Sequence, residues 1–467
     1  MSVTNASIPR ESRPVLWIIL VSFAMIVVDN SIVFTGLNKI QQELGFTDEG
    51  LSWISSIYAL TFGGFLLIGA RAGDLFGRRR VFSLGLLVFS LASLAICFAP
   101  TPAVLVAARA VQGLGAAIIA PSTLSLLQAE FAPGPVRTRA VSYYAAAGGV
   151  SASVGLVIGG IFAGWLTWRL GFFINVPIGL ALMWALKRYA HASNRQEGRI
   201  DYVGAVTSTG AIGLLLVAID RSGTAGWGDS MTLTLLLASI LLLIAFVVVQ
   251  TRVSTPLMPL RLFASSERAG AYAARALFIG ANMSFYFFIS EFLQGVLGLN
   301  ASAAGAAFLP STVVNFAAAM FVSRLIGRFG NGPVLLVTVT CGLVGMISLS
   351  MVSSASGYWT ALAVPMILVG IGQGGSLAPL TNAAIAGVRK EDAGAASGVV
   401  NVAHQMGASL GIGVVTAYAA NAVNLAGGAE LLSERVHLAM QAASGMMVIS
   451  LLIVMFIAFR RPVAVAA

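Results

Sequence analysis

The segment GARAGDLFGRRR, residues 69–80, interrupts an apolar chain with one acid, Asp74, followed by three consecutive arginines. Of the 467 residues, 58% are hydrophobic and only 9% are charged. A soluble domain carries about 25% charged residues, so this chain cannot cover a water-facing surface. The composition predicts an all-α polytopic membrane protein, in which residues 69–80 connect two spans.

Fourteen predominantly apolar runs are long enough to cross a bilayer as helices, which takes roughly 20 residues each. They are residues 15–37, 51–71, 81–99, 102–128, 138–165, 169–188, 200–219, 231–251, 270–294, 303–326, 333–352, 359–386, 394–420 and 437–459. The loops between them are short, and no phosphate-binding Gly-Lys motif occurs. We therefore expect no enzyme. The two cysteines lie far apart, and neither a cofactor nor a metal site is expected.

The loop charges predict the orientation of the chain. With fourteen spans, the clusters Arg78–Arg80, Lys187–Arg188 and Arg460–Arg461 fall on the side of both termini, while the opposite loops hold few basic residues. By the positive-inside rule both termini are cytoplasmic. The excess of arginine over lysine and the many Ala and Gly residues suggest a bacterial cytoplasmic membrane. The net charge of +10 lies in short clusters between apolar runs, so nucleic acid is not expected as a partner.

An internal repeat divides the chain. RAGDLFG (71–77) is echoed by RLIGRFG (324–330), and APST (120–123) by APLT (378–381), at nearly equal offsets. This predicts two six-helix halves, residues 1–195 and 263–467, separated by two inserted spans within 196–262. Paired halves with a site near the membrane midplane are typical of transporters. Chance similarity between small-residue helices is the alternative.

The opening segment combines an acid with a basic loop, which suggests a charge-paired latch between two helices. Asp74, Gly77, Arg78 and Arg79 are therefore predicted gating residues, with Gly77 supplying the tight turn. The alternative is that the arginines only fix the topology of the loop.

Several segments together carry a resemblance to a known family. They are GARAGDLFGRRR, RAVQGLGAA (109–117), WRLGFFINVPIG (168–179), VDNSIVFTGLNKIQQELG (28–45) and FLQGVLGLNASAAGAAFLP (292–310). The chain resembles a major facilitator superfamily transporter of the fourteen-span drug:proton antiporter family. The resemblance implies the major facilitator fold, alternating access and proton-driven efflux, and it associates Arg109 with proton coupling.

The fifth span departs from the antiporter pattern. AAAGGVSASVGLVIGG (145–160) has Leu156 where family antiporters usually have a proline. Gly155, Gly159 and Gly160 remain; Gly155 and Gly159 are one turn apart, which allows close helix packing, and Gly160 is interpreted as a packing residue. Pure packing is the alternative to an antiport role for each glycine.

Charged groups at membrane depth are costly and therefore point to function. Asp29 in the first span and Arg109 in the fourth are both expected about 11 Å below the outer surface, from the rise per helical residue. Equal depth allows the two residues to meet or to share a water-filled cavity, and we predict that Asp29, Arg109 and Glu291 serve proton coupling. The alternatives are a static ion pair and, for Glu291, simple exposure at the outer interface.

Polar side chains along the spans are candidates to line a substrate cavity, although a lone histidine in a helix is more often a hydrogen-bonded core residue. The candidates are Asn30, Gln112, Asn282, Gln294, Asn401 and His404. The predicted function is efflux of drugs, antibiotics or other amphipathic molecules in exchange for protons, by a monomer in the lipid bilayer. A proton-coupled importer and a transport-inactive sensor are the alternatives.

Overall fold

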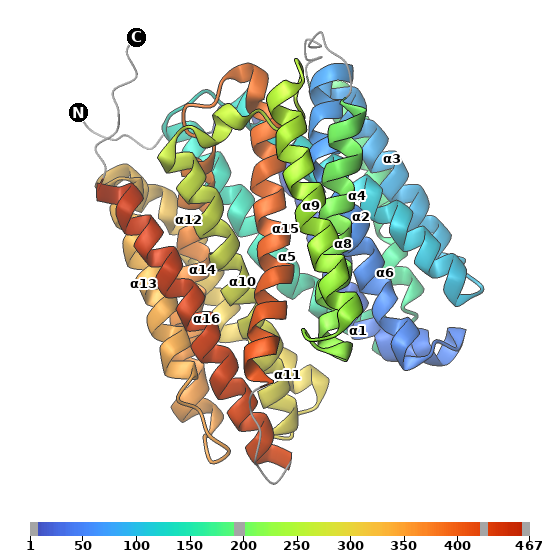
Figure 1. The fold of residues 1–467 in the computed structure, drawn as a ribbon, viewed down its shortest axis with the longest axis vertical. Helices are drawn as coiled ribbons and strands as arrows, with labels where there is room; N and C mark the ends of the chain where they lie inside the picture. Colours follow the sequence, from blue (N-terminus) through green and yellow to red (C-terminus); the bar gives the residue numbers. More distant parts are fainter. Residues whose placement is uncertain (1–7, 191–200, 421–427, 460–467) are drawn as a thin grey trace. The chain divides into compact units, whose positions relative to one another are not determined.

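The computed structural model describes residues 8–190, 201–420 and 428–459, and long helices dominate this part of the chain (Figure 1). The helices of the first part are α1 (Arg13–Leu44), α2 (Asp48–Phe76), α3 (Arg78–Cys97), α4 (Pro102–Glu130), α5 (Pro135–Trp165), α6 (Arg169–Phe173), α7 (Asn175–Tyr189), α8 (Tyr202–Ala225) and α9 (Ser230–Arg252). The later ones are α10 (Ser266–Gly295), α11 (Ala301–Ala307), α12 (Leu309–Phe329), α13 (Asn331–Leu349), α14 (Ala363–Ala384), α15 (Ala393–Ala419) and α16 (Gly428–Phe459).

Local sequence signals set the helix ends. The side chains of Thr47, Thr101 and Asp229 each accept a hydrogen bond from a backbone N–H in the first turn of α2, α4 and α9, as N-caps do. At the other end, α1 stops at Gly45 with φ 73°, and α2 stops at Gly77 with φ 97°. Glycine is favoured at these positions because a side chain would strain a positive φ.

Thirteen of the described helical stretches are long and apolar enough to cross a membrane. Three of the predicted spans cover two pieces each. One consists of α6 and α7, one of α11 and α12, and in the third a π-helical turn at Tyr358–Leu362 leads into α14. The predicted fifth span, residues 138–165, lies within α5, which is helical throughout but is not among the thirteen. The described helices are thus compatible with fourteen spans.

By its internal contacts the chain divides into two units. The N-terminal unit holds Ser7–Leu260 together with Val388–Met406, and the C-terminal unit holds Arg261–Gly387 and Gly407–Ala467. The first part of α15 therefore belongs to the N-terminal unit and its second part to the C-terminal unit. The predicted domain boundaries at residues 195 and 262 remain a prediction, because this division follows contacts and not the repeat.

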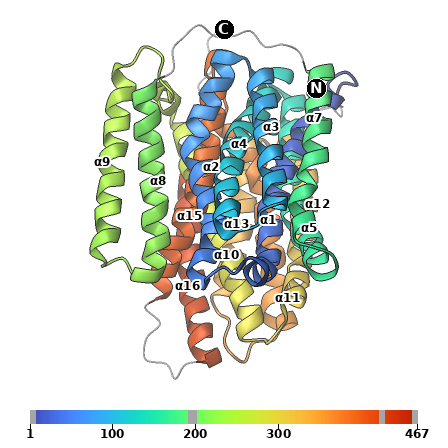
Figure 2. The ribbon, with the colours of Figure 1, turned by 90° about the vertical axis from the view of Figure 1, so that its right-hand side faces the viewer.

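The core of the N-terminal unit joins α1, α2, α3, α4 and α7 through buried residues such as Phe62, Phe82, Phe89 and Leu186. Helices α8 and α9 pack on each other, and α8 also lies along α2 (Figure 2). Only 17% of the most apolar stretch of α9 is buried inside the protein. An apolar helix with so little protein cover is suited to face lipid.

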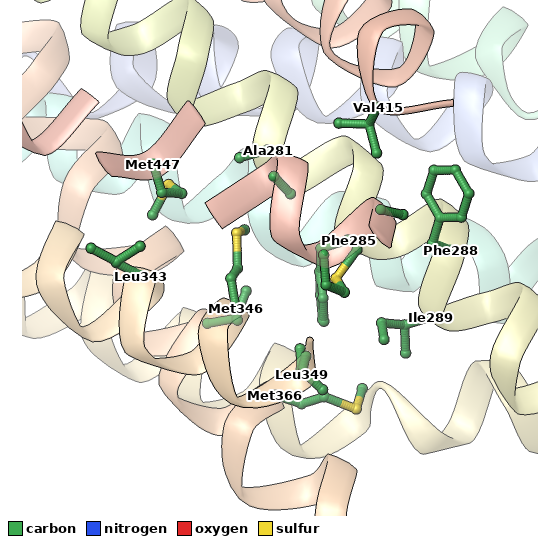
Figure 3. Close-up of a cluster of buried hydrophobic side chains, with 14 of the residues drawn as sticks. Ala281, Phe285, Phe288, Ile289, Leu343, Met346, Leu349, Met366, Val415 and Met447 are labelled. Atoms are coloured by element: carbon green, nitrogen blue, oxygen red, sulfur yellow. The ribbon is translucent and has the colours of Figure 1, made fainter. Parts of the chain in front are cut away.

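The core of the C-terminal unit is rich in aromatic and methionine side chains. Phe285, Phe288, Met346, Met366 and Met447 pack together where α10, α13, α14 and α16 meet (Figure 3). Flexible methionines fill irregular gaps between rigid rings.

Each of the two units contains a close contact between helices at a glycine. In the N-terminal unit, a Cβ on Gly69 of α2 would lie 2.3 Å from the backbone of Ala117 in α4. In the C-terminal unit, a Cβ on Gly374 of α14 would lie 2.0 Å from the backbone of Asn315 in α12. Helices α2, α3 and α4 pack on one another as α12, α13 and α14 do, which is the pattern that an internal repeat produces.

Candidate functional site

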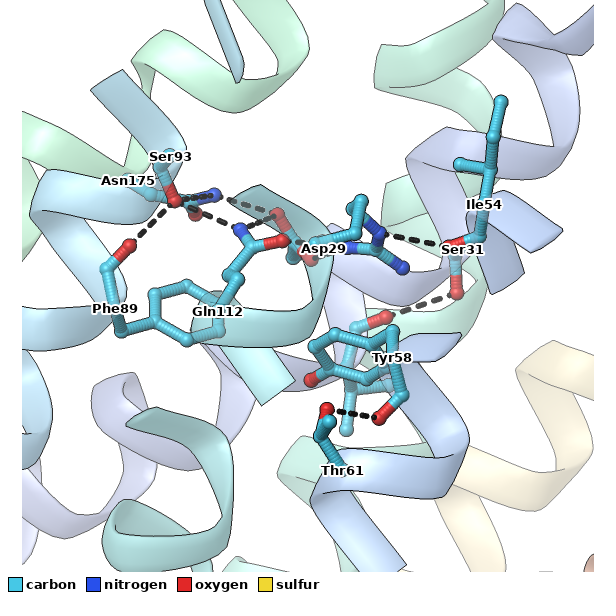
Figure 4. A network of polar contacts seen from close by, with 11 residues as sticks. Asp29, Ser31, Ile54, Tyr58, Thr61, Phe89, Ser93, Gln112 and Asn175 are labelled. Carbon is cyan, nitrogen blue, oxygen red and sulfur yellow. Dashed lines mark hydrogen bonds and ion pairs between the residues drawn. The ribbon is translucent and has the colours of Figure 1, made fainter. Parts of the chain in front are cut away.

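A buried polar network surrounds Asp29 in the N-terminal unit (Figure 4). Arg109 Nη1 donates to Asp29 Oδ2 at 2.8 Å. Gln112 Nε2 and Asn175 Nδ2 both donate to Asp29 Oδ1, at 2.8 and 2.7 Å. Ser93 Oγ accepts from the same two amides at 2.8 and 3.3 Å. Of the two arrangements that equal depth allows for Asp29 and Arg109, the structure has direct contact, and two amides and a hydroxyl extend the network.

The ion pair at the centre of this network has no exposed surface. The side chains of Asp29 and Arg109 are both 0% exposed. Burial makes each charge costly, and only a partner with further hydrogen bonds offsets that cost. All three donors point at the carboxyl oxygens, an arrangement that stabilises negative charge on Asp29.

The helix pattern explains how residues from four elements converge. Arg109 and Gln112 are three residues apart on α4 and therefore share a face. Gly113 lies beside them, where a Cβ would come within 2.7 Å of the carbonyl oxygen of Tyr58. This absence of a side chain brings α2 against α4 and places Tyr58 beside the guanidinium. Asn175 enters from the first turn of α7.

Aromatic groups and a backbone carbonyl complete the surroundings of Arg109. Its Nε donates to the carbonyl of Ile54 at 3.0 Å. Its Cζ lies 4.2 Å from the ring centroid of Tyr58 and 5.8 Å from that of Phe172. Arg109 Nη2 and the hydroxyl of Tyr58 are buried and have no hydrogen-bond partner among the described residues.

A second cluster lies at the junction of α2 and α3, where the predicted gating residues are. Arg78 pairs with Asp74 at 3.2 Å and donates to the carbonyl of Ser125 in α4 at 3.3 Å. Arg79 donates to the carbonyl of Ala190, the C-terminal cap of α7, at 3.3 Å. Gly77 provides the turn with φ 97°. The arginines therefore bind specific partners in this unit, beyond any effect on topology.

The start of α15 packs closely against this junction. A Cβ on Gly394 would lie 2.2 Å from Asp74 Oδ2, and one on Gly398 would lie 2.9 Å from the Cβ of Ala70. Gln128, near the end of α4, donates to the hydroxyl of Ser397 at 2.9 Å, with both side chains buried. Asp74, α4 and the start of α15 thus form one packed cluster.

The other predicted site residues lie outside these two clusters. Glu291 of α10 is half-buried, and its Oε2 has no hydrogen-bond partner among the described residues. It belongs to the C-terminal unit, whereas Asp29 belongs to the N-terminal unit. A joint role of these two acids in proton coupling stays a prediction.

The candidate cavity residues differ in exposure. Gln112 is part of the Asp29 network. Asn282 is buried with an unpartnered Oδ1 within the described chain, while Asn401 and His404 are partly exposed. Asn30 and Gln294 are exposed, and Gln294 donates to Ser290 on its own helix. A role of these residues in substrate binding stays a prediction.

The three glycines of α5 have different surroundings. A Cβ on Gly155 would lie 2.7 Å from the Cβ of Ser31 and 2.8 Å from the carbonyl oxygen of Val28. Gly155 therefore lets α1 and α5 approach beside Asp29, and Gly159 is also buried. The prediction of close packing is wrong for Gly160. This residue is exposed, and a Cβ added there would meet nothing within 4 Å among the described residues.

A further ion pair in the N-terminal unit, between Glu43 and Arg169, joins α1 to α6. Glu43, just before the end of α1, accepts hydrogen bonds from Arg169 and from the indole of Trp168, the latter at 3.0 Å. Partial burial raises the pKa of Glu43, but the hydrogen bonds and the positive charge of Arg169 outweigh it and hold this pKa below its usual range. The pair ties the end of α1 to the start of α6.

Sequence reasoning missed four residues of these clusters, namely Tyr58, Ser93, Gln128 and Ser397. Serine and tyrosine are common in membrane helices, so their composition carries no signal. Asn175 is a polar residue of the quoted segment WRLGFFINVPIG, and nothing in the sequence indicates that it contacts Asp29.

Comparison with known proteins agrees with the fold. Residues 19–412 match the sequence profile of the Major Facilitator Superfamily. The cephamycin export protein CmcT of Amycolatopsis lactamdurans is 36% identical over 84% of this chain and 82% of its own length. The puromycin resistance protein pur8 of Streptomyces alboniger is 33% identical over 86% and 80%.

Solved structures share the fold at low identity. The human organic anion transporter MFSD10 (TETRAN) superimposes with a TM-score of 0.67 at 12% identity, over 96% of this chain and 100% of its own. The proton:xylose symporter XylE gives 0.63 at 13%, over 94% of each chain.

The helical bundle, the intramembrane ion pair and these similarities define a multi-pass membrane transporter. The chain belongs to the Major Facilitator Superfamily, and it is a secondary transporter of that superfamily's drug and antibiotic efflux type. The resemblance inferred from residues 69–80 and the other motifs is confirmed.

Proposed function

We propose that Asp29 is the proton-binding group through which this transporter exchanges protons for an exported molecule. One observation carries the proposal: Asp29 and Arg109 form an ion pair at 2.8 Å with no exposed surface. A buried ion pair is weak evidence for a role in stability, because apolar replacements of similar volume are often at least as stable. Intramembrane charges are, in contrast, a common feature of proton pathways.

The burial of Asp29 also offers a way to couple proton binding to substrate transport. An anion held by Arg109, Gln112 and Asn175 has no route for a proton while the site is closed. A conformation that opens the site to one side lets Asp29 exchange its proton with that side only. Alternating access of the two halves, residues 1–195 and 263–467, would then link proton entry to substrate exit.

The cluster at Asp74 supports a gating role. Asp74, Gly77, Arg78 and Arg79 connect α2, α3, α4 and α7, and the start of α15 packs against Asp74. We place this cluster at the cytoplasmic end, with both termini cytoplasmic, because Arg78–Arg80 and Arg460–Arg461 fall on one side. Opening towards the cytoplasm would then separate α15 from α2 and α4. We expect the transporter to act as a monomer.

The substrate is proposed to be an amphipathic drug or antibiotic. One relative is named as a cephamycin export protein and the other as a puromycin resistance protein, and both compounds are small organic antibiotics. Asn282, Asn401 and His404 offer polar groups in both units, and Asn30 and Gln294 offer exposed ones, whereas the amide of Gln112 is engaged in the Asp29 network. Glu291 is a second acid that could take part in coupling from the C-terminal unit.

The test uses the full chain in proteoliposomes with an imposed pH gradient. The probes are ethidium as a lipophilic cation, and puromycin and a cephamycin as antibiotics, with Asp29→Asn as the control. Movement of a probe against the proton flow, lost in Asp29→Asn, would support the proposal. Movement together with protons would instead establish a proton-coupled importer. Antiport that persists in Asp29→Asn would remove Asp29 from coupling.

A further inference from the structure

Proton binding by Asp29 changes the electrostatic surroundings of Arg109. Once the carboxyl group is neutral, the guanidinium loses its counter-ion while remaining inside the membrane. An unpaired cation at that depth is costly. Some other group must stabilise Arg109 in the protonated state, or Asp29 would rarely accept a proton.

Two aromatic rings already contact Arg109. Its Cζ lies 4.2 Å from the centroid of Tyr58 and 5.8 Å from that of Phe172, within the roughly 6 Å over which a ring face attracts a cation. The two rings come from different elements, α2 and α6, and both side chains are at least 98% buried. The Ile54 carbonyl accepts from Nε at 3.0 Å, which keeps the guanidinium close to Tyr58.

Unused hydrogen-bonding capacity lies at the same place. Arg109 Nη2 and the Tyr58 hydroxyl are buried and have no partner among the described residues. Buried polar atoms without partners are rare and call for an explanation. Here they show that Tyr58 contacts Arg109 through its ring and not through its hydroxyl.

We propose that Tyr58 and Phe172 form an aromatic clamp that holds Arg109 after Asp29 binds a proton, and that Tyr58 thereby sets the pH at which the proton binds. The inference rests on the proposed role of Asp29. Tyr58 is a positioning residue, since it acts through Arg109 and touches neither the proton nor the substrate.

The clamp favours the protonated state because its attraction differs between the two states. While Asp29 is an anion, its charge cancels much of the field that Arg109 exerts on the rings. After protonation the full cation acts on them. Only such a difference can shift an equilibrium. Loss of the Tyr58 ring should therefore disfavour the protonated state and require a lower pH to reach it.

Few other titratable groups face this site. Around Asp29 of α1 lie Arg109 from α4, Tyr58 from α2 and the thiol of Cys97 from α3, which interacts with Asp29 electrostatically. Helices α6 and α7 contribute Phe172 and Asn175, neither of which titrates, and α5 contributes Gly155. Arg169 of α6 is paired with Glu43. Among the described residues, no unpaired cation other than Arg109 is identified at this site.

The experiment is infrared difference spectroscopy of the full-length protein in lipid, titrated with pH and without substrate. The carboxylic acid band that vanishes in Asp29→Asn identifies protonated Asp29. Tyr58→Phe retains the ring and should leave the midpoint within about 0.3 pH units. Tyr58→Leu removes the ring and should lower the midpoint by about one unit, which is the scale of a desolvated cation–ring contact. Phe172→Leu, from the more distant ring, should lower it less.

Each outcome decides one question. A wild-type midpoint in folded Tyr58→Leu would overturn the clamp while leaving Asp29 as the proton site. Equal shifts in Tyr58→Phe and Tyr58→Leu would also overturn it, because the hydroxyl would then be responsible. A titrating band unaffected by Asp29→Asn would refute the proposed proton site itself. If Tyr58→Leu does not fold, Phe172→Leu with Tyr58→Phe as its control decides, and an unshifted midpoint contradicts the clamp.

Discussion

Asp74 occupies the space that a side chain on Gly394 would need: a Cβ built on Gly394 would lie 2.2 Å from Oδ2 and 2.6 Å from Oδ1 of Asp74. The two residues are far apart in the sequence but belong to one packed unit. The carboxyl group that pairs with Arg78 is therefore also the surface on which α15 begins.

Gly394→Ala should separate α15 from α2 and impair the transport cycle. The added methyl meets a carboxyl group that is fixed by Arg78, so α15 must move. We expect a loss of transport of about tenfold, on the order of 1.4 kcal/mol, and faster thiol labelling of Ser397→Cys in that background. Gly445→Ala in α16, where an added Cβ would meet nothing within 4 Å in the described part of the chain, is the matched control and should behave as wild type. Unchanged labelling with normal transport would show that this contact is not part of a gate.

Asp29 and Arg109 should be strongly coupled in stability. Arg109→Leu leaves a buried carboxylate unpaired, which costs roughly 3–5 kcal/mol. Asp29→Asn leaves Arg109 against two rings and a carbonyl, so its cost should be smaller. The double variant should be more stable than Arg109→Leu alone. Thermal unfolding of the four proteins in detergent measures this cycle. Additive changes would mean that the two charges do not depend on each other.

Gly155→Val should destabilise the N-terminal unit, whereas Gly160→Val should not. A Cβ on Gly155 meets the backbone of α1 at 2.8 Å, and overpacking of this kind costs about 1–3 kcal/mol. Gly160 is exposed on the same helix and has open space around it, which makes it a control for valine in α5. The readouts are thermal stability and the yield of monodisperse protein. Equal losses in both variants would point to the helix itself and not to its contact with α1.

The loop between α8 and α9 should contribute pH-dependent stability at strongly acid pH. A hydrogen bond from Arg221 and one from the backbone of Thr232 lower the pKa of Asp229 from 3.8 to about 2. A depressed carboxyl pKa stabilises the folded state above the unfolded value near 3.8, and this stability is lost as the pH falls through about 2. The effect should be small, because the group is exposed.

Asp229→Asn tests this, since asparagine keeps the helix cap and removes the charge. Its unfolding temperature should fall slightly below that of wild type above pH 4 and converge with it towards pH 2. Arg221→Gln should show the same convergence. A constant difference at all pH values would assign the loss to the cap and not to the ion pair.

The sequence by itself determined the membrane class, the succession of helices and the superfamily. Apolar runs of about 20 residues form helices in lipid because the backbone must satisfy its own hydrogen bonds there. A glycine with positive φ at Gly77 and an N-cap at Thr47 set helix ends. It also placed Asp29 and Arg109 at equal depth in two spans, which allows direct contact or a shared water-filled cavity, and isolated charges at that depth are costly. The exposed position of Gly160 was not predictable, since glycine content does not reveal which face of a helix is covered.

Only the tertiary structure decided which neutral side chains complete the site. Asn175, Ser93 and the ring of Tyr58 reach the ion pair because α2, α3, α4 and α7 rotate particular faces inward. Helical periodicity gives each residue a face but not the neighbour that the face meets. The hydrogen bond from Gln128 to Ser397 joins residues 269 positions apart, and such a pairing depends on the packing angles and approach of whole helices, which no local pattern encodes.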